Sequence, residues 1–347
     1  MVSVCVFAQA PLAARQSTAV NPQAYVNAID EYVTGHELPE TVMTLQLWTR
    51  KDFEAAVDRL ILERNPQQLE AAAILQLEMA LGVMAVSPEG AQIHFELGEK
   101  LLRSLAPTPA ERRVNPGREE ELHRVWSTWF GVAASGYMWV TDVRRAAPWI
   151  RKARQFAPRS SSLRVIEGSA HEIEASGFKP DQGLTNSQKV RTYFERNRRL
   201  ELAQASFRAA VAADPLNPRA RIRLGRILFL FGKIEEARQE TERGRELARK
   251  PDDIYLAALF LGAIKERLND LAGARLSYAQ ALTVAPRSQT VIVALAHLDL
   301  MSGRPDRAQS LARAFASAPV DDHVWWAYKN GGLDHDGLAT LRERVRQ

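Results

Sequence analysis

The chain has 347 residues, of which 46% are apolar and 25% charged, a composition typical of folded proteins and foreign to disordered, collagen-like or disulfide-rich chains. Its one cysteine, Cys5, excludes an intramolecular disulfide, a zinc finger and a cysteine-bound iron–sulfur cluster. The net charge of +5 is modest, and no apolar run reaches the roughly 18 residues that a membrane-spanning helix needs.

The N-terminal segment, residues 1–16, has two interpretations. It starts with a short apolar run that ends in small residues, as a secretory signal does, and cleavage after Ala8 fits best. No Lys or Arg precedes the run, so the signal would be truncated, and the alternative is a disordered tail. A signal predicts a periplasmic or secreted protein, and a tail predicts a cytoplasmic one. The residues before Cys5 do not favour a lipoprotein.

The N-terminal region, residues 17–126, is expected to be helical. Apolar residues at three- and four-residue spacing predict helices over 22–34, 40–64, 67–84, 88–105 and 115–137. Prolines separate these helices, and the segment from Pro107 to Gly117 is expected to be an exposed loop. The helices form either degenerate hairpins that continue the repeats described next or a separate bundle.

The C-terminal half repeats itself. Prolines recur at intervals of 36, 35 and 33 residues, each where a helix should end: Pro215, Pro251, Pro286 and Pro319. An alanine, a large residue, an alanine and a proline recur at spacings of 4, 3 and 5 in three places: Ala203–Phe207–Ala210–Pro215, Ala274–Tyr278–Ala281–Pro286 and Ala146–Ile150–Ala153–Pro158. A small residue precedes the second-helix alanine by 12 residues in four places, at Gly225, Gly262, Ala296 and Ala134.

This pattern resembles the tetratricopeptide repeat family, whose units are helical hairpins stacked in a right-handed superhelix. The best matches span 127–160 and 184–319, within a predicted repeat region of 127–319. The resemblance implies an all-α superhelical solenoid in which small residues let the two helices of a hairpin approach closely.

Two segments depart from the regular repeat. An insertion near 177–188 delays the partner of the helix that carries Gly168, because Gly168 and Ala203 are 35 residues apart where 12 are expected. Either an irregular hairpin or a long extended helix must fill the difference. At the other end, residues 320–347, with an aromatic cluster at 325–328, are expected to form helices that cap the last repeat.

Motifs that carry chemistry are absent from the sequence. The interval from Gly225 to Gly232-Lys233 is too long for a phosphate-binding loop, lacks the following Ser or Thr, and lies inside a repeat. No Gly-x-Ser-x-Gly motif occurs. We therefore predict a protein that is not an enzyme and uses no cofactor. An unrecognised helical catalytic domain in the N-terminal region is a minor alternative.

Two clusters of acids with histidine and one group of aromatic residues have ordinary structural interpretations. Asp321-Asp322-His323 and Asp334-His335-Asp336 precede predicted helices, where acids cap free N–H groups, so we predict caps and no metal site. Aromatic residues at helical spacing are expected to form core in preference to a stacking site for bases or sugars: Trp126, Trp129, Phe130, Tyr137, Trp139 and Trp149.

Basic residues are the most informative polar feature. They form three runs: Arg144, Arg145, Arg151, Lys152, Arg154 and Arg159; Lys189, Arg191, Arg196, Arg198 and Arg199; and Arg219, Arg221, Arg223 and Arg226. One interpretation is a basic binding surface. The other is a solvated helix face whose arginines pair with neighbouring acids such as Glu235 and Glu236.

The family resemblance implies that first helices line a concave groove that holds an extended peptide or a partner helix. Carried over to this chain, the groove residues are Arg219, Ile222, Arg223, Arg226, Phe229, Leu256, Leu259, Glu266, Val293 and His297. Ile222 occupies a place where a carboxylate clamp wants a polar side chain, so specificity for a terminal carboxylate is not implied.

The predicted function is that of a non-catalytic scaffold that binds an acidic protein or peptide segment in a locally basic groove, in envelope or secretion-related assembly if the N-terminal signal is real. The alternative is a helical repeat protein that binds nucleic acid through its arginines. The sequence does not specify the oligomeric state.

Overall fold

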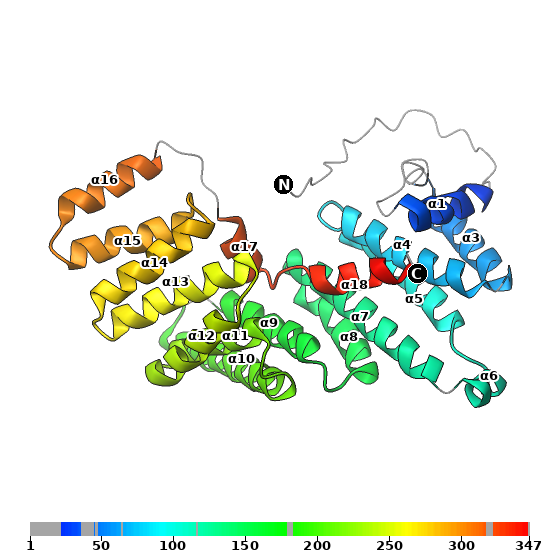
Figure 1. Ribbon diagram of the computed structural model, residues 1–347, viewed down its shortest axis with the longest axis horizontal. Helices are drawn as coiled ribbons and strands as arrows, with labels where there is room; N and C mark the ends of the chain where they lie inside the picture. The colour runs from blue at the N-terminus through cyan, green and yellow to red at the C-terminus, as the bar shows by residue number, and fades with distance from the viewer. Residues whose placement is uncertain are drawn as a thin grey trace. The chain divides into compact units, whose positions relative to one another are not determined.

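The computed structural model describes residues 22–35, 45, 48–63, 65–115, 117–178, 183–316 and 322–345. Every regular element in these ranges is an α-helix (Figure 1). The predicted signal or tail at residues 1–16 and the repeat proline Pro319 lie outside the described ranges. Among the helices of the described residues, none has the length and apolarity needed to span a membrane.

The chain divides into two compact units. Unit 1 comprises residues 1–140 and 334–347, and unit 2 comprises residues 141–333. The predicted boundaries at 126/127 and 319/320 stay predictions. The first predicted hairpin, 127–160, has its helices in different units, and their pairing also stays a prediction.

Unit 1 contains seven of the described helices: α1 (Pro22–Gly35), α3 (Arg50–Glu63), α4 (Pro66–Val83), α5 (Pro88–Ser104), α6 (Pro109–Val114), α7 (Gly117–Trp139) and α18 (His335–Val345). The hairpin α4/α5 is its centre, with α1 packed on α4 and α3 packed mainly on α5. The C-terminal helix α18 packs on α7 and α4. Arg342 of α18 holds the buried Glu78 of α4 through two 2.5 Å hydrogen bonds, so residues far apart in sequence fix this unit.

Most of the aromatic residues that were predicted to form core are buried. Four of them are buried on α7: Trp126, Trp129, Phe130 and Tyr137. Trp149 is buried on α8, in unit 2. The Trp129 indole N–H donates to the Ala73 carbonyl oxygen at 2.9 Å, which satisfies its polar atom inside the core. Core packing is therefore confirmed for these five residues, while the sixth of the group, Trp139, is half-buried at the end of α7.

Two local predictions in unit 1 are corrected. The segment expected to be a loop between Pro107 and Gly117 contains α6, a short helix without buried side chains. It forms because Thr108 and Glu111 make a reciprocal capping box and Pro109 occupies the first helical position. The helix expected over 40–64 is interrupted at Trp48 and Thr49, and α3 begins at Arg50, because the Asp52 carboxylate accepts from the Thr49 N–H at 2.6 Å and caps the start there. Leu45 is helical, and the other residues between 40 and 47 lie outside the described residues.

Unit 2 is a stack of helical hairpins, and the all-α superhelical class is confirmed. Its helices are α8 (Val143–Phe156), α9 (Ser161–Gly177), α10 (Asn186–Ala213), α11 (Pro218–Leu230), α12 (Ile234–Leu247), α13 (Pro251–Arg267), α14 (Leu271–Val284), α15 (Gln289–Met301), α16 (Pro305–Ala316) and α17 (His323–Lys329). The hairpins are α9/α10, α11/α12, α13/α14 and α15/α16, and each packs against the next. We call α9, α11, α13 and α15 the first helices, and the surface that these four helices form together the first-helix face.

Small residues hold the hairpins together as predicted. A Cβ atom on Gly225 would lie 2.1 Å from the Thr241 hydroxyl oxygen, and one on Gly262 would lie 2.2 Å from the Tyr278 ring. Atoms at such distances overlap, so only glycine lets the first helix approach its partner this closely. The insertion near 177–188 is resolved in favour of a long helix: α10 has 28 residues, and Phe207 in its second half packs against Gly168.

Candidate functional site

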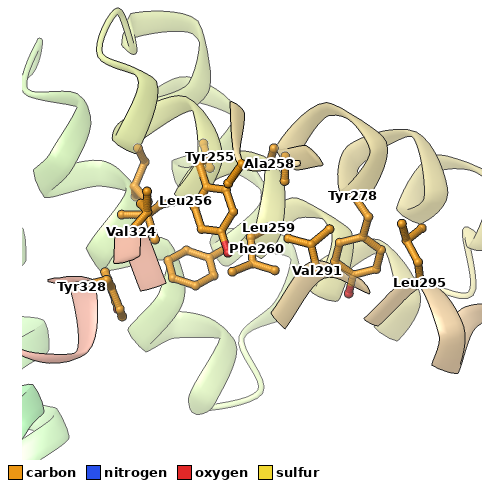
Figure 2. Packing of buried hydrophobic residues seen from close by; sticks show 14 of the residues in the cluster. Tyr255, Leu256, Ala258, Leu259, Phe260, Tyr278, Val291, Leu295, Val324 and Tyr328 are labelled. Atoms are coloured by element: carbon orange, nitrogen blue, oxygen red, sulfur yellow. The ribbon is translucent and has the colours of Figure 1, made fainter. Parts of the chain in front are cut away.

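The last helix of unit 2, α17, lies on the first-helix face. It packs on α13, where its residues Val324 and Tyr328 join the buried cluster around Leu256 and Phe260 (Figure 2). The Tyr328 and Phe260 ring centroids are 5.2 Å apart in an edge-to-face arrangement, and Trp325 stacks on Tyr328 at 5.4 Å. Of the residues expected to cap the last repeat, those of α17 pack on α13 and those of α18 pack within unit 1, so a cap on the last repeat stays a prediction.

A polar triad joins α17 to two first helices. Arg223 of α11 is 4% exposed, and its guanidinium donates to the Glu172 carboxylate of α9 at 3.1 Å and to the Tyr328 carbonyl oxygen at 3.3 Å. It also lies 4.3 Å from the centre of the Tyr328 ring. The Tyr328 hydroxyl donates to the other Glu172 oxygen at 2.5 Å. Each member therefore fixes the other two.

The surroundings keep the Tyr328 hydroxyl protonated. Burial, with the Glu172 carboxylate as the next cause, raises the pKa of Tyr328 well above its ordinary value of 10.0. The phenol therefore stays a neutral donor at every physiological pH. Glu172 consequently has both oxygens occupied, and a further anion at this place would have to be held by the other cations.

A cavity of about 190 Å³ opens beside this triad, and we call it the α17 cavity. Its walls come from α9, α10, α11 and α17. The polar residues that line it are Ser169, Glu172, Ser176, Arg196, Arg223, Arg226 and Lys329, and the rest of the wall includes Ile173, Leu200, Leu230 and the Trp325 ring. Four cations and a single carboxylate thus line one partly open cavity.

Three of the sequence-predicted groove residues occupy equivalent repeat positions that mediate packing between hairpins. Ile222 and Leu259 are buried, at 1% and 6% exposure, in a cluster formed with the following hairpin. Val293 occupies the same position on the last hairpin and is 57% exposed. The exposure follows the presence of a next hairpin, so this position contributes to the stack, and its part in partner binding stays a prediction. Leu256, also predicted, is buried with them beneath α17.

The other predicted groove residues lie along the first-helix face. Arg226 is half-buried in the wall of the α17 cavity, 5.4 Å from the centre of the Phe260 ring and 5.8 Å from that of Phe229. Arg219 pairs with the buried Asp253 at 3.4 Å. His297 on α15 is exposed. Partner binding by the predicted residues stays a prediction.

The surroundings of Glu266 and Arg223 differ from those expected of residues that line an open groove. The Glu266 carboxylate is half-buried, and its charge adds to burial in raising the pKa of Tyr278. Arg223 is enclosed by Glu172 and Tyr328, so it supports the face from beneath. Its burial follows from α17, which covers it.

The three basic runs are paired with acids only in part. Arg221 binds Glu240 at 2.7 Å, Arg154 binds Glu167 at 2.6 Å and Arg199 binds Glu174 at 2.9 Å. Glu235 and Glu236, the predicted partners of the third run, pair instead with other cations of α10 to α12. The interpretation of a paired helix face is correct in kind for these arginines, while the identity of the acids is wrong.

The two acid–histidine clusters differ. Asp334 caps α18 as predicted, since its carboxylate accepts from the Gly337 N–H at 3.0 Å. Asp322 makes no side-chain cap for α17; it accepts from the Ser288 hydroxyl at 2.7 Å and so ties α17 to the start of α15. Asp321 lies outside the described residues. Within those residues, no group of three or more His, Cys, Asp or Glu side chains is arranged to hold a metal ion.

The features that sequence reasoning missed are Glu172, Lys329 and the placement of α17. The repeat period carries no information about a helix that follows the last hairpin. The aromatic residues at 325–328 are a partial signal, because a short helix with three large rings buries some of them against a neighbouring surface, as Trp325 and Tyr328 do here.

Comparison with known proteins supports the repeat assignment. Residues 196–259 match the family model described as tetratricopeptide repeat. None of the curated proteins matches the chain. Among solved structures, PilF of Pseudomonas aeruginosa is similar at 18% identity, over 64% of this chain and 90% of PilF, with a TM-score of 0.46. The tetratricopeptide repeat protein TTC0263 of Thermus thermophilus is similar at 16% identity, over 66% of this chain and all of that one, with a TM-score of 0.42. Yeast Tom70 has 14% identity over 97% of this chain and 66% of Tom70, with a TM-score of 0.43.

Proposed function

The chain is a tetratricopeptide repeat protein, and we propose that it works as a non-catalytic scaffold whose first-helix face binds a segment of a partner protein. The observation that carries this proposal is the α17 cavity, where four cations and one carboxylate gather beside the aromatic surface of α17. A rigid stack presents such a surface before the partner arrives, so little ordering is needed on the scaffold side.

We propose that the partner segment is acidic. Arg196, Arg226 and Lys329 line the cavity, and none of the three makes an ion pair among the described residues. Unpaired cations in an enclosed wall favour a segment that supplies carboxylates or other anions. The cations of the cavity gather in one small space and not along a track, which suits a protein segment better than a long polyanion such as a nucleic acid, and we prefer a protein partner.

Site-specific cross-linking tests this proposal. A photoreactive amino acid is placed at Arg226 or His297, on the first-helix face, and in matched controls at Leu276 or Arg243, which are exposed on the second helices α14 and α12. After irradiation in the native host, we expect one partner to be trapped from the first two positions and absent from the last two, through a peptide with net negative charge.

Equal trapping from all four positions, or none from the first-helix face, would refute binding by this face. Trapping through a neutral or basic peptide would retain the face and refute the acidic partner. The same cells, fractionated before irradiation, test whether the protein is exported.

A further inference from the structure

The α17 cavity contains polar atoms for which the protein offers no partner. The Nε atom of Arg223 and the hydroxyl of Ser169 are both buried, and neither has a hydrogen-bond partner among the described residues. The two residues are 4% and 1% exposed, and both line the cavity. Buried polar groups without a partner are rare, because each loses its hydrogen bonds to water and gains none in return. Two of them on one cavity wall indicate a ligand with acceptor atoms.

The charged residues that line the cavity indicate the sign of the charge on that ligand. Glu172 is engaged through both oxygens by Arg223 and Tyr328. Arg196, Arg226 and Lys329 have no carboxylate partner among the described residues. The wall therefore keeps an excess of three positive charges over the single carboxylate, and a ligand that binds there must be an anion.

The number of donors distinguishes a phosphate from a carboxylate. A carboxylate carries one negative charge on two oxygens, whereas a phosphate monoester carries roughly 1.5 to 2 negative charges on three strong acceptor oxygens near neutral pH. The wall offers cations from α10, α11 and α17 together with the Ser169 hydroxyl on α9. Donors on four sides match three diverging oxygens better than the two oxygens of a planar carboxylate.

The size and shape of the cavity agree with this chemistry. A volume of about 190 Å³ is several times the roughly 30 Å³ that one water molecule occupies in the liquid. A phosphate group with the first atoms of its ester fits, whereas a helix or a folded segment does not. The Trp325 ring and Leu230 supply an apolar side for the carbon atoms of the ester.

We propose that the α17 cavity binds a phosphate monoester group, held by Arg226, Lys329 and Arg196 with the Arg223 Nε–H and the Ser169 hydroxyl as further donors. This site extends the proposed function. It rests on that function only for the identity of the molecule that carries the phosphate group. The carrier is either a phosphorylated residue of the partner segment or a small phosphate ester.

Titration calorimetry on the full chain tests the site. N-acetyl-phosphoserine amide is compared with N-acetyl-glutamate amide and N-acetyl-serine amide at one ionic strength. We expect the phosphoserine compound alone to bind, with affinity reduced about tenfold or more in Arg226→Gln and in Lys329→Gln. The matched control Arg287→Gln removes an exposed cation outside the cavity and should leave binding unchanged. Arg223 is kept, because its loss would leave Glu172 without its cation.

A spectroscopic measurement keeps the proposal testable if a variant folds poorly. In the unmodified chain, the Arg223 Nε–H resonance should shift on addition of the phosphoserine compound and stay in place with the glutamate compound. A phosphoserine peptide that binds about tenfold more tightly than the amide identifies a partner segment as the carrier; equal affinities identify a small ester.

Equal binding of glutamate and phosphoserine, no binding of either, or binding that survives both cavity variants would overturn the phosphate site. If the phosphate site fails while His297 still traps a partner, the scaffold function stands. If the ester binds and no partner is trapped from the first-helix face, the cavity stands and the scaffold function falls.

Discussion

The repeats of unit 2 and the helices of unit 1 achieve close packing by different routes. In unit 2 the small residue of a first helix contacts the second helix of its own hairpin: Gly168 meets Phe207, Gly225 meets Thr241 and Gly262 meets Tyr278. In unit 1 the close approaches join helices of different pairs: Gly98 of α5 meets Trp129 of α7, and Gly136 of α7 meets Leu81 of α4. A repeat thus needs mainly its own residues to form a hairpin, while unit 1 depends on contacts between distant parts of its sequence.

The largest expected effect on stability comes from a substitution at the centre of unit 1. Trp129→Ala deletes a fully buried indole and its hydrogen bond to Ala73. We expect unfolding free energy to fall by about 3 to 5 kcal/mol. Hydrogen exchange should show the loss of protection in α4, α5 and α7. The control Trp326→Ala removes an indole that is 48% exposed. Equal losses in the two variants would contradict the central place of Trp129.

Unit 1 should also differ from unit 2 in how its stability depends on pH. Burial lowers the pKa of His94 from 6.5 to about 4, with its Nδ1 atom 2.7 Å from the Gln76 side-chain oxygen. The unfolded chain therefore binds the proton more strongly than the folded one. The neutral ring gives its full contribution to stability above pH 6.5, and that contribution is lost as the pH falls toward 4.

The expected size of this loss is about 3 kcal/mol, because the pKa of His94 falls from 6.5 to about 4 on folding. Chemical denaturation at pH 7.5, 6, 5 and 4 measures it. His94→Asn keeps a hydrogen-bonding group for Gln76 and does not titrate, so its stability should fall less between pH 6.5 and 4. An identical slope in both proteins would show that His94 is not responsible.

The next effect tests the repeats. Gly262→Ala places a methyl group 2.2 Å from the Tyr278 ring, which is buried between α13 and α14. We expect a loss of about 1 to 3 kcal/mol from overpacking. The matched control Gly177→Ala, at a helical glycine with nothing within 4 Å, should be neutral or slightly stabilising. Thermal unfolding compares them. A harmless Gly262→Ala would mean that the hairpin does not need its small residue.

The smallest expected effect is a gain. Thr141, in the turn after α7, has a φ of 61°, a left-handed conformation that strains a β-branched residue. The turns after α11 and α15 place Gly232 and Gly303 in this conformation. Thr141→Gly should therefore raise stability by about 1 kcal/mol, as the reduced strain outweighs the added freedom of the unfolded chain. Denaturant midpoints would reveal it, and a decrease would show that the threonine side chain contributes a contact worth more than the strain.

The sequence predicted the repeats well because their signals are local. Glycine at 225 and 262, alanine at 237 and 274, and the prolines between them fix helix ends and contact faces within one hairpin. The helices of unit 1 were also located, apart from α6 and the start of α3, because apolar spacing marks them. Their pairing could not be inferred, since it rests on contacts such as Arg342 with Glu78 across 264 residues.

The candidate site was anticipated in part. Arg226 was placed in the wall of a binding face, and the cavity does contain it. Ile222 and Leu259 were assigned to the groove from family geometry, yet the same repeat position also mediates contact with the next hairpin, and packing prevails wherever that hairpin exists. Glu172 and Lys329 were missed because α17, which brings them together with Arg223 and Arg226, belongs to no repeat.

The turns that end α11, α13 and α15 have an implication for how such a chain grows. Gly232, Asn269 and Gly303 adopt the same left-handed conformation, and the residue after each donates to a carbonyl five residues earlier, at Leu228, Lys265 and Asp299. Each hairpin therefore encodes its own reversal within a handful of residues. A duplicated gene segment of one period would bring a complete folding instruction with it, so the array can lengthen or shorten during evolution without a newly designed junction.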